Sequence, residues 1–477
     1  MSDTASTGPG EHLSHNHVGP FLMLLNLYGD PVALDIFSEN RTVNYWLCVE
    51  RALAAAQAEV GILTHQEAGA IAQACDLSRI DMRRLWDETR HVGYPILPLV
   101  RMVVETLPPG ADGRLHYGAT TQDIMDTALS LQLGDCQRRL DQLLVKLGNE
   151  LAPLVARYSS TIMAARTHGQ QAVPTTCGAK LAVFLEEIRH ALLQSEQLKG
   201  RIGLLSLHGA GGTSAAFGRQ ISEIRRCMAE TLDLRSQDVP WHVARDGIVA
   251  FGLHCGMLAA LTSRFAREII DLSRTEIGEM REGGDYHRGA SSTMPQKVNP
   301  IASEAIIGMA AVAGALSSAL LRAMEAGHER ASGEWQIEWL AVPEVAMLAA
   351  SCLSMAIDLT TNLQIFPDQM TNNMRLDHGL LMAEAYMMRM APELGRERAH
   401  DIVYQAAMSA RTNSRSLREV LTETTAGITM GSVALNGDLV PEDYLGEAEN
   451  VCRVAGDDWN ALIRGYPKDG VSDELDA

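Results

Sequence analysis

Apolar residues recur along this chain with the spacing of helices, and the expected helix length changes from one part of the chain to the next. Residues 42–60 (TVNYWLCVERALAAAQAEV) predict a helix that ends at Gly61. Several shorter helical patterns follow up to about residue 110. The helices then become very long and shorten again after residue 366; the long ones are expected at roughly 122–157, 175–201, 242–280, 301–327 and 335–363.

This change in helix length predicts a domain organisation. Long helices are stable when they stack on other long helices, and the apolar faces of these five exceed what one layer can cover. We therefore expect burial against further copies of the chain. The predicted fold class is all-α. Its parts are a mobile tail, an N-terminal helical domain, a central bundle of long helices and a C-terminal helical domain, at residues 1–20, 21–110, 111–365 and 366–477.

The composition narrows the function classes. The formal net charge of −19 at pH 7 disfavours nucleic acid and membranes as partners, although a local site can still bind a small anion. The eight cysteines show no metal-binding spacing and the N-terminus shows no signal peptide, so we expect a cytoplasmic protein with reduced thiols. The longest apolar stretch, Ala305–Leu321, has 17 residues. A membrane span needs about 20, so this stretch predicts a buried core helix. We expect no cofactor and no metal.

The segment Arg281–Pro300, REGGDYHRGASSTMPQKVNP, has the clearest chemical pattern. Its glycines permit backbone conformations that other residues avoid, which suits a mobile lid. Pro300 is typical of the first position of a helix, here the one expected from residue 301. Lys297 and Asn299 would then lie at a helix N-terminus, where anions bind readily. The same pattern also fits an ordinary loop between two helices.

The segment His116–Thr127, HYGATTQDIMDT, opens the first long helix. Thr120, Thr121 and Gln122 offer hydroxyl, amide and backbone donors at that helix start. Threonine and aspartate are also common helix caps. The residues alone therefore favour substrate binding and capping equally.

Three further features carry weaker signals. His168 follows Thr167 just before a long helix, in Ala165–Thr176 (ARTHGQQAVPTT), although a lone histidine is usually structural. His91 ends the sequence ETRH near the end of the N-terminal domain. The glycine-rich segment Leu207–Ser214 (LHGAGGTS) fits the floor of a site and a structural turn equally well.

The sequence GASSTMPQKVNP at residues 289–300 resembles the signature of the fumarase/aspartase superfamily, usually G-S-S-x-M-P-x-K-x-N-P, with Ala290 in an unusual place. The resemblance extends over the whole chain, including the order of short, long and short helices. It implies a three-domain helical fold and a homotetramer whose active sites are each built from three subunits. It also implies an enzyme, a lyase that acts on a small dicarboxylate.

The resemblance also implies a role for each candidate residue. Ser291 is the base that removes the proton next to a carboxylate, which leaves a doubly charged aci-carboxylate. Lys297 and Asn299 stabilise that charge. A serine is a poor base unless its alkoxide is stabilised, so we expect backbone N–H groups and Lys297 near Ser291. His168 acts as a general acid or orients the substrate; the other substrate-binding candidates are Ser292, Thr120, Thr121, Gln122, Thr167 and His91.

Within the superfamily, the chain is most similar to the branch of adenylosuccinate lyase and 3-carboxy-cis,cis-muconate cycloisomerase. Glu329–Glu344 (ERASGEWQIEWLAVPE) and Pro240–Asp246 (PWHVARD) resemble the cycloisomerase pattern. Trp335 and Trp339 stand where nucleotide-handling lyases carry serine and arginine for a phosphate, and Trp241 replaces a substrate-binding glutamine. Because the loss of a cationic contact to a phosphate is costly, adenylosuccinate is disfavoured as the substrate.

Two features favour a lyase that releases fumarate over a cycloisomerase. Many cycloisomerases carry tryptophan or another residue at the position of His168, and Gln296–Val298 resembles the fumarate-forming lyases. The preferred hypothesis is β-elimination from a C2-substituted succinate, with nitrosuccinate, which loses nitrous acid, as the leading candidate. The alternatives are 3-carboxy-cis,cis-muconate cycloisomerase and then adenylosuccinate lyase. Loss of the loop serine, lysine or asparagine would favour a purely structural lyase-fold protein, and all three are present.

Overall fold

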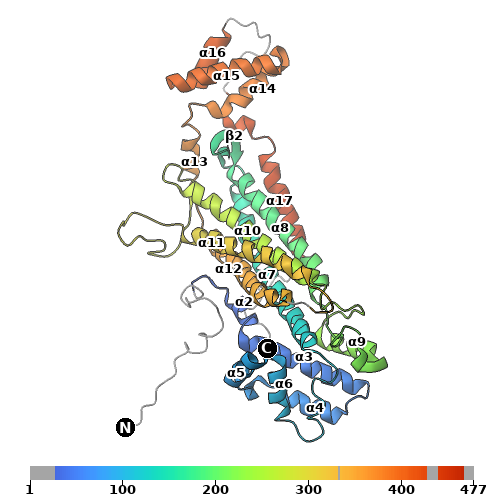
Figure 1. Ribbon diagram of the computed structural model, residues 1–477. Coiled ribbons are helices and arrows are strands. Elements are labelled where there is room, and N and C mark those ends of the chain that lie inside the picture. Colours follow the sequence, from blue (N-terminus) through green and yellow to red (C-terminus); the bar gives the residue numbers. More distant parts are fainter. Residues whose placement is uncertain (1–26, 331–332, 427–438, 467–477) are drawn as a thin grey trace, which may run out of the picture.

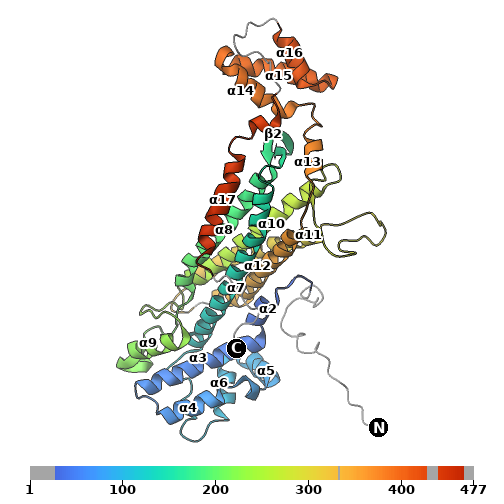
Figure 2. The same ribbon diagram turned by 180° about the vertical axis from the view of Figure 1, so that it is seen from behind.

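Long helices rich in alanine and leucine make up most of this molecule, in a computed structural model that describes residues 27–330, 333–426 and 439–466. The tail predicted at residues 1–20 lies outside the described residues. Nearly all regular structure in the described ranges is helical, which confirms the predicted all-α class. The molecule is elongated, with the N-terminal helices at one end and a small helical unit at the other (Figure 1; the reverse view is Figure 2).

In the described residues the N-terminal end is formed by α2 (Pro31–Ile36), α3 (Glu39–Glu59), α4 (His65–Ala74), α5 (Met82–Val92) and α6 (Ile96–Val104). Side chains satisfy the free N–H groups at several of their starts, as in the capping box formed by Thr64 and Glu67. The apolar residues of α3 pack on two sides, against α4 and against the central part of the chain. Helix α3 therefore joins the N-terminal helices to the bundle.

Five long helices form the central bundle: α7 (Thr121–Arg157), α8 (Cys177–Ile202), α10 (Asp246–Ser273), α11 (Ile301–Leu320) and α12 (Glu334–Thr361). The helix expected at 242–280 is shorter than predicted, because the chain becomes extended at Arg274 and Met280–Arg281 (β3) pairs with Gln364–Ile365 (β4). Helix α9 (Ile221–Leu232) lies beside α3. Short 3-10 helices link the elements at Leu77–Arg79, Ala215–Gln220, Leu321–Glu325, Leu380–Met382 and Pro441–Tyr444.

Helix α11 is buried along one stripe only. Its buried residues, such as Ile306, Ala313 and Ser317, repeat at helical spacing, whereas Val312 is 49% exposed. By length and composition α10, α12 and residues 301–325 are each apolar enough to span a membrane. The most apolar stretch is 61% buried within the chain in α10 and 67% buried in α12, but only 28% buried in residues 301–325. The expected core helix is thus buried on one side in a single chain, and its other side is an open apolar face.

The C-terminal part differs from the expected unit at 366–477. Helices α13 (Pro367–Asn373), α14 (Ala383–Leu394), α15 (Arg396–Asn413) and α16 (Leu417–Thr425) follow the bundle, but α17 (Ala448–Ile463) returns to it. Trp459 of α17 is fully buried against α7, where a Cβ on Gly148 would lie 2.1 Å from the indole ring. The apolar face of α17 therefore completes the central core, and the separate unit contains α14, α15 and α16 with their own small core.

Candidate active site

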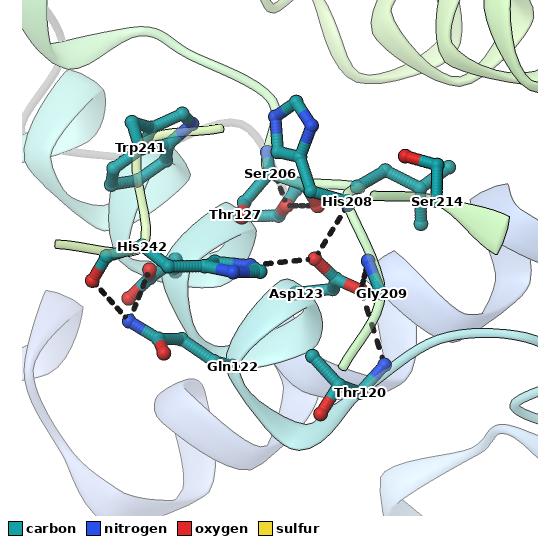
Figure 3. Close-up of polar contacts among 12 residues, drawn as sticks. Thr120, Gln122, Asp123, Thr127, Ser206, His208, Gly209, Ser214, Trp241 and His242 are labelled. Carbon is teal, nitrogen blue, oxygen red and sulfur yellow. Dashed lines mark hydrogen bonds and ion pairs between the residues drawn. The ribbon is translucent and has the colours of Figure 1, made fainter. Parts of the chain in front are cut away.

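The start of α7 is held by one buried carboxylate, that of Asp123 (Figure 3). It accepts hydrogen bonds from the backbone N–H groups of Thr120 at 3.1 Å, His208 at 2.8 Å and Gly209 at 2.9 Å, and it pairs with His242 Nε2 at 2.9 Å. Burial alone would raise the pKa of this carboxyl, but the His242 ring and the backbone N–H groups outweigh burial and lower it. The carboxylate therefore stays ionised and joins the helix start to the glycine-rich segment.

That glycine-rich segment, Leu207–Ser214, is fixed in place by Arg225. The guanidinium donates to His208 Nδ1 at 3.0 Å and to Ser214 Oγ at 2.6 Å. Because arginine only donates, His208 accepts at Nδ1 and its ring is neutral. Burial and the Arg225 charge lower the pKa of His208 to about 4. The segment is thus a rigid wall beside the start of α7.

A buried ionic network lies one helical turn further along α7. Arg245 is 2% exposed and binds Asp126 at 2.7 and 3.0 Å and Glu338 at 2.7 and 2.5 Å. Gln122 Nε2 donates to Asp126 at 3.1 Å and to a backbone carbonyl at 2.8 Å, while its Oε1 accepts from Arg330 Nε at 2.9 Å. The amide of Gln122 is therefore occupied within the chain, where it orients the Arg330 guanidinium.

Arg330 and His91 are two further polar residues on separate elements, and Arg330 is held at the start of α7 by Gln122. Arg330 Nη2 is buried and has no hydrogen-bond partner in the part of the chain that the structure describes. His91 is exposed in the last turn of α5, and Tyr94 after it stacks on Trp335 of α12 with ring centroids 6.2 Å apart. The residue after α5 thus packs on the start of α12, while the start of α7 holds Arg330, whose Nη2 is a buried donor.

The loop before α11 is closed at its base by backbone contacts. Ala290 and Val298 form an antiparallel bridge, and Asn299 N donates to Gly289 O at 2.8 Å. Gly289 has a φ of +69°, and a Cβ there would lie 2.4 Å from Asn299 O. This position therefore requires glycine, and the closure depends on it.

Ser291 lies just inside this closure, in contact with backbone donors. Its Oγ accepts hydrogen bonds from the N–H groups of Thr293 at 3.3 Å and Met294 at 3.1 Å. Lys297 directly precedes Val298, the other residue of the bridge that closes the loop. The side chains of Ser292 and Lys297 are exposed. The backbone donors expected near the Ser291 oxygen are thus present; its role as the base stays a prediction.

The anion site expected at the N-terminus of α11 is already filled by the protein. The helix begins one residue after Pro300, and the N–H groups of Ala302 and Ser303 donate to the Glu282 carboxylate at 3.1 and 2.7 Å. Glu282 is only 6% exposed. These N–H groups are therefore occupied rather than open to an anion, and Pro300 precedes the helix rather than occupying its first position.

His168 lies at the tip of a β-hairpin. The helical pattern of the sequence does not predict this hairpin. Strands β1 (Ile162–Thr167) and β2 (Gln170–Thr176) pair antiparallel and leave His168 and Gly169 as a two-residue turn. Both residues have positive φ, 52° and 75°, as the tightest hairpin turns require. Such a turn projects its first side chain away from the strands at a defined position.

A buried ion pair anchors the hairpin to the end of the bundle. Arg166 binds Glu279 at 2.8 and 2.6 Å, and Asn373 of α13 donates to the same carboxylate at 2.8 Å. Thr167 and His168 beyond this anchor are exposed. The hairpin therefore presents its tip outward from a rigid base.

The three predicted segments do not meet in one chain. Thr120 caps the start of α7 and the hairpin follows the end of this helix. The 37 helical residues at about 1.5 Å each span about 55 Å. In both views the loop at 283–300 projects from the side of the bundle, while the hairpin lies near the C-terminal unit (Figure 1; Figure 2). A substrate that contacts all three segments therefore needs more than one copy of the chain.

Three residues of this region are not singled out as site residues by the sequence patterns: Asp123, Arg245 and Arg330. Asp123 follows Thr120 at the spacing of a capping box, which is a readable signal. Arg245 and Arg330 lie in the PWHVARD and ERASGEW segments, but buried pairing cannot be read from a single sequence. Among the described residues, no group of three or more His, Cys, Asp or Glu is arranged to hold a metal ion.

Comparison with known proteins defines the class. A family model described as "Lyase" matches residues 29–314, and one described as "Adenylosuccinate lyase C-terminus" matches residues 379–454. A solved 3-carboxy-cis,cis-muconate lactonizing enzyme from Pseudomonas putida has a TM-score of 0.84 and 32% identity, covering 92% of this chain and 99% of that one. The chain therefore belongs to the fumarase/aspartase superfamily and is an enzyme of the lyase class, as the loop sequence predicts.

Curated relatives within this superfamily cover several reactions. A 3-carboxy-cis,cis-muconate cycloisomerase from Pseudomonas aeruginosa is 37% identical over 87% of this chain and 91% of its own length. Trans-aconitate decarboxylase 1 from Mycosarcoma maydis is 36% identical over 84% and 81%. An N-acetyl-S-(2-succino)cysteine lyase from Dickeya dadantii is 30% identical over 91% and 95%.

Proposed function

We propose that this chain eliminates a substituent from C2 of a succinate and releases fumarate, in sites shared between the subunits of a homotetramer. The observation that carries the shared sites is that about 55 Å of helix α7 separates its polar start from the His168 hairpin, while the loop at 283–300 projects from the side of the bundle. The open apolar face of α11 is the natural surface for the other copies, because an exposed apolar face of this size marks an interface.

Substrate binding begins at the start of α7. Arg330 has a buried donor without a partner, held in place by Gln122, and one carboxylate of a succinate satisfies it. Thr120 and Thr121 supply hydroxyl groups at the positive end of the same helix. In this scheme Gln122 is a positioning residue, because its amide is already occupied.

Proton removal takes place at the loop of a second subunit. Ser291 takes the proton from C3, and the two N–H groups that already reach its oxygen stabilise the alkoxide. Lys297 and Asn299 stabilise the aci-carboxylate, without help from the filled N-terminus of α11. The electron pair then expels the C2 substituent, and His168 of a third subunit orients the substrate or protonates the leaving group.

Nitrosuccinate is the first substrate to test, since nitrite leaves without strong acid assistance. Cycloisomerisation of 3-carboxy-cis,cis-muconate is the second candidate, favoured by the 37% identity to a cycloisomerase over most of both chains. The enzyme is incubated with nitrosuccinate, aspartate, adenylosuccinate, N-acetyl-S-(2-succino)cysteine and 3-carboxymuconate, and fumarate and lactone are followed. Lactone formation without fumarate from any succinate would overturn the elimination proposal.

Shared sites are tested by mixing inactive subunits. Ser291→Ala and His168→Asn are each expected to be inactive, and their co-expression should restore about a quarter of the activity, because the two residues come from different subunits. Mixtures that stay inactive while mass photometry shows tetramers would mean that each site draws both residues from one chain.

A further inference from the structure

A cavity of about 680 Å³ lies beside the proposed substrate position, and the proposed chemistry does not use it. It lies between the N-terminal helices, α7, α12 and the α11 face proposed above as the subunit contact, so in the proposed tetramer a neighbouring copy borders it at Val312 and Leu316. Most of its wall is apolar; its aromatic and aliphatic lining residues include Phe37, Trp46, Met125, Leu129, Leu316, Trp335, Trp339, Pro343 and Met347. A nitro group alone would leave most of this volume empty.

Two tryptophans form a firm wall of this cavity. The rings of Trp335 and Trp339 meet edge to face with centroids 5.0 Å apart, and Tyr94 packs on both, at 6.2 and 5.9 Å. Such aromatic contacts hold the rings in place. The wall is therefore already built in the free protein and does not need a ligand to form.

The charged groups of the wall disfavour a negative ligand. Asp126 and Glu338 line the cavity, and one cation, Arg245, is shared between their two carboxylates. Glu344 adds a third carboxylate to the lining. The indole N–H of Trp339 is buried without a partner in the described ranges, so one acceptor would be satisfied there.

The cavity lies within one helical turn of the substrate-binding groups. Asp126 follows Gln122 by one turn of α7, which is about 5.4 Å, and Trp335 lies in the first turn of α12 shortly after Arg330. A succinate bound at Arg330 therefore has its C2 substituent in reach of the cavity. We propose that this cavity is the subsite for the C2 substituent, and that it selects an apolar substituent without negative charge that carries a hydrogen-bond acceptor. This inference rests on the proposed elimination.

A series of S-substituted mercaptosuccinates tests this subsite, because each one differs only in the substituent. Elimination removes the C3 proton, breaks the C2–S bond and leaves the electron pair on sulfur, so the products are fumarate and a thiol. We expect kcat/KM to be at least about tenfold higher for S-benzyl than for S-methyl, and lower than S-methyl for S-(2-carboxyethyl). Equal values for S-benzyl and S-methyl, or a preference for the carboxyethyl compound, would overturn the proposal.

Two variants change the cavity in opposite ways. Trp339→Leu removes part of the wall, and Leu129→Phe fills the space; each should reduce the ratio of S-benzyl to S-methyl kcat/KM at least about fivefold, in protein that remains tetrameric. Trp339→Phe keeps the ring but removes the N–H group. If Leu129→Phe leaves the ratio of S-benzyl to S-methyl kcat/KM unchanged and the tetramer is lost, a neighbouring copy fills the cavity. That result would also overturn the proposal.

The failure of the elimination proposal can be told apart from the failure of the subsite. If no mercaptosuccinate yields fumarate, elimination fails, and binding of the same compounds is measured by calorimetry. Tighter binding of S-benzyl than of S-methyl by at least about tenfold, lost in Leu129→Phe, still supports an apolar subsite. Equal binding of the two compounds refutes it.

Discussion

Replacement of Arg245 by methionine should destabilise the protein strongly, by an amount that depends on pH. Methionine keeps much of the side-chain volume but removes the cation between Asp126 and Glu338. The three side chains are 2%, 1% and 1% exposed, so water cannot replace the guanidinium. Two carboxylates would then be buried close together without a counter-charge.

The expected loss follows from the burial of these groups. Removal of one partner from a buried ion pair typically lowers the free energy of unfolding by about 3–5 kcal/mol, and here one removal leaves two carboxylates. Burial already raises the pKa of Glu338 in the presence of Arg245. Without it, the pKa of Glu338 would lie further above its value in the unfolded chain, because the cation that offsets burial is gone. A carboxyl with such a raised pKa destabilises the fold fully above its folded-state pKa, and the penalty is lost as the pH falls towards its unfolded-state pKa. The loss of stability should therefore shrink from pH 7.5 towards pH 5.

Urea and thermal unfolding at pH 7.5 and pH 5.5 measure this loss. Arg264→Met is the matched control, because its ion pair with Glu187 is 45% and 38% exposed and should contribute about 0–1 kcal/mol. Combining Arg245→Met with Asp126→Asn and Glu338→Gln should recover much of the stability at pH 7.5. A midpoint of Arg245→Met equal to that of the wild type, or a loss that grows as the pH falls, would refute the reasoning.

The remaining predictions concern the loop serine, the loop closure and a buried histidine. Ser291→Ala should lower kcat at least about 10²-fold while Ser292→Ala costs less than tenfold; a few-fold effect of Ser291→Ala in steady-state assays excludes it as the base. Gly289→Ala should open the loop, because its Cβ would lie 2.4 Å from Asn299 O, and faster tryptic cleavage of the loop with little change in melting temperature checks this. His208, with a pKa lowered to about 4, contributes stability above about pH 6.5 that is lost as the pH falls to about 4, by at most about 3 kcal/mol. Urea midpoints of His208→Gln should be flatter over this range, and an unchanged pH profile contradicts the assignment.

Most of the helices could be predicted from the sequence, because helical spacing of apolar residues is a local signal. The helices at 121–157, 301–320 and 334–361 lie close to their predicted positions. The helix predicted at 242–280 ends early at Ser273, since the apolar pattern continues while the chain turns to pair β3 with β4. The return of α17 to the bundle is equally invisible in sequence, because its partner Gly148 lies some 300 residues away in the chain.

The candidate site was predictable in its parts but not in its arrangement. The loop with Ser291 and Lys297 could be found from one continuous segment, as could the start of α7. The hairpin that carries His168 is not predicted from the helical pattern, although His-Gly between two short extended runs is a weak hairpin signal. The filled N-terminus of α11 could not be foreseen, because Glu282 reaches it from outside the helix.

The sequence by itself determined the helical class and the superfamily and predicted the loop proposed to carry the chemistry, because each of these is written in local spacing or in a continuous motif. The tertiary structure alone decided which polar groups are already occupied. Glu282 fills one helix end, Gln122 holds Arg330, and Arg245 neutralises two carboxylates beside a cavity. The length of α7 likewise separates its polar start from the His168 hairpin of the same chain. The physical reason is that burial and pairing depend on distances between remote segments, which no local pattern of residues records.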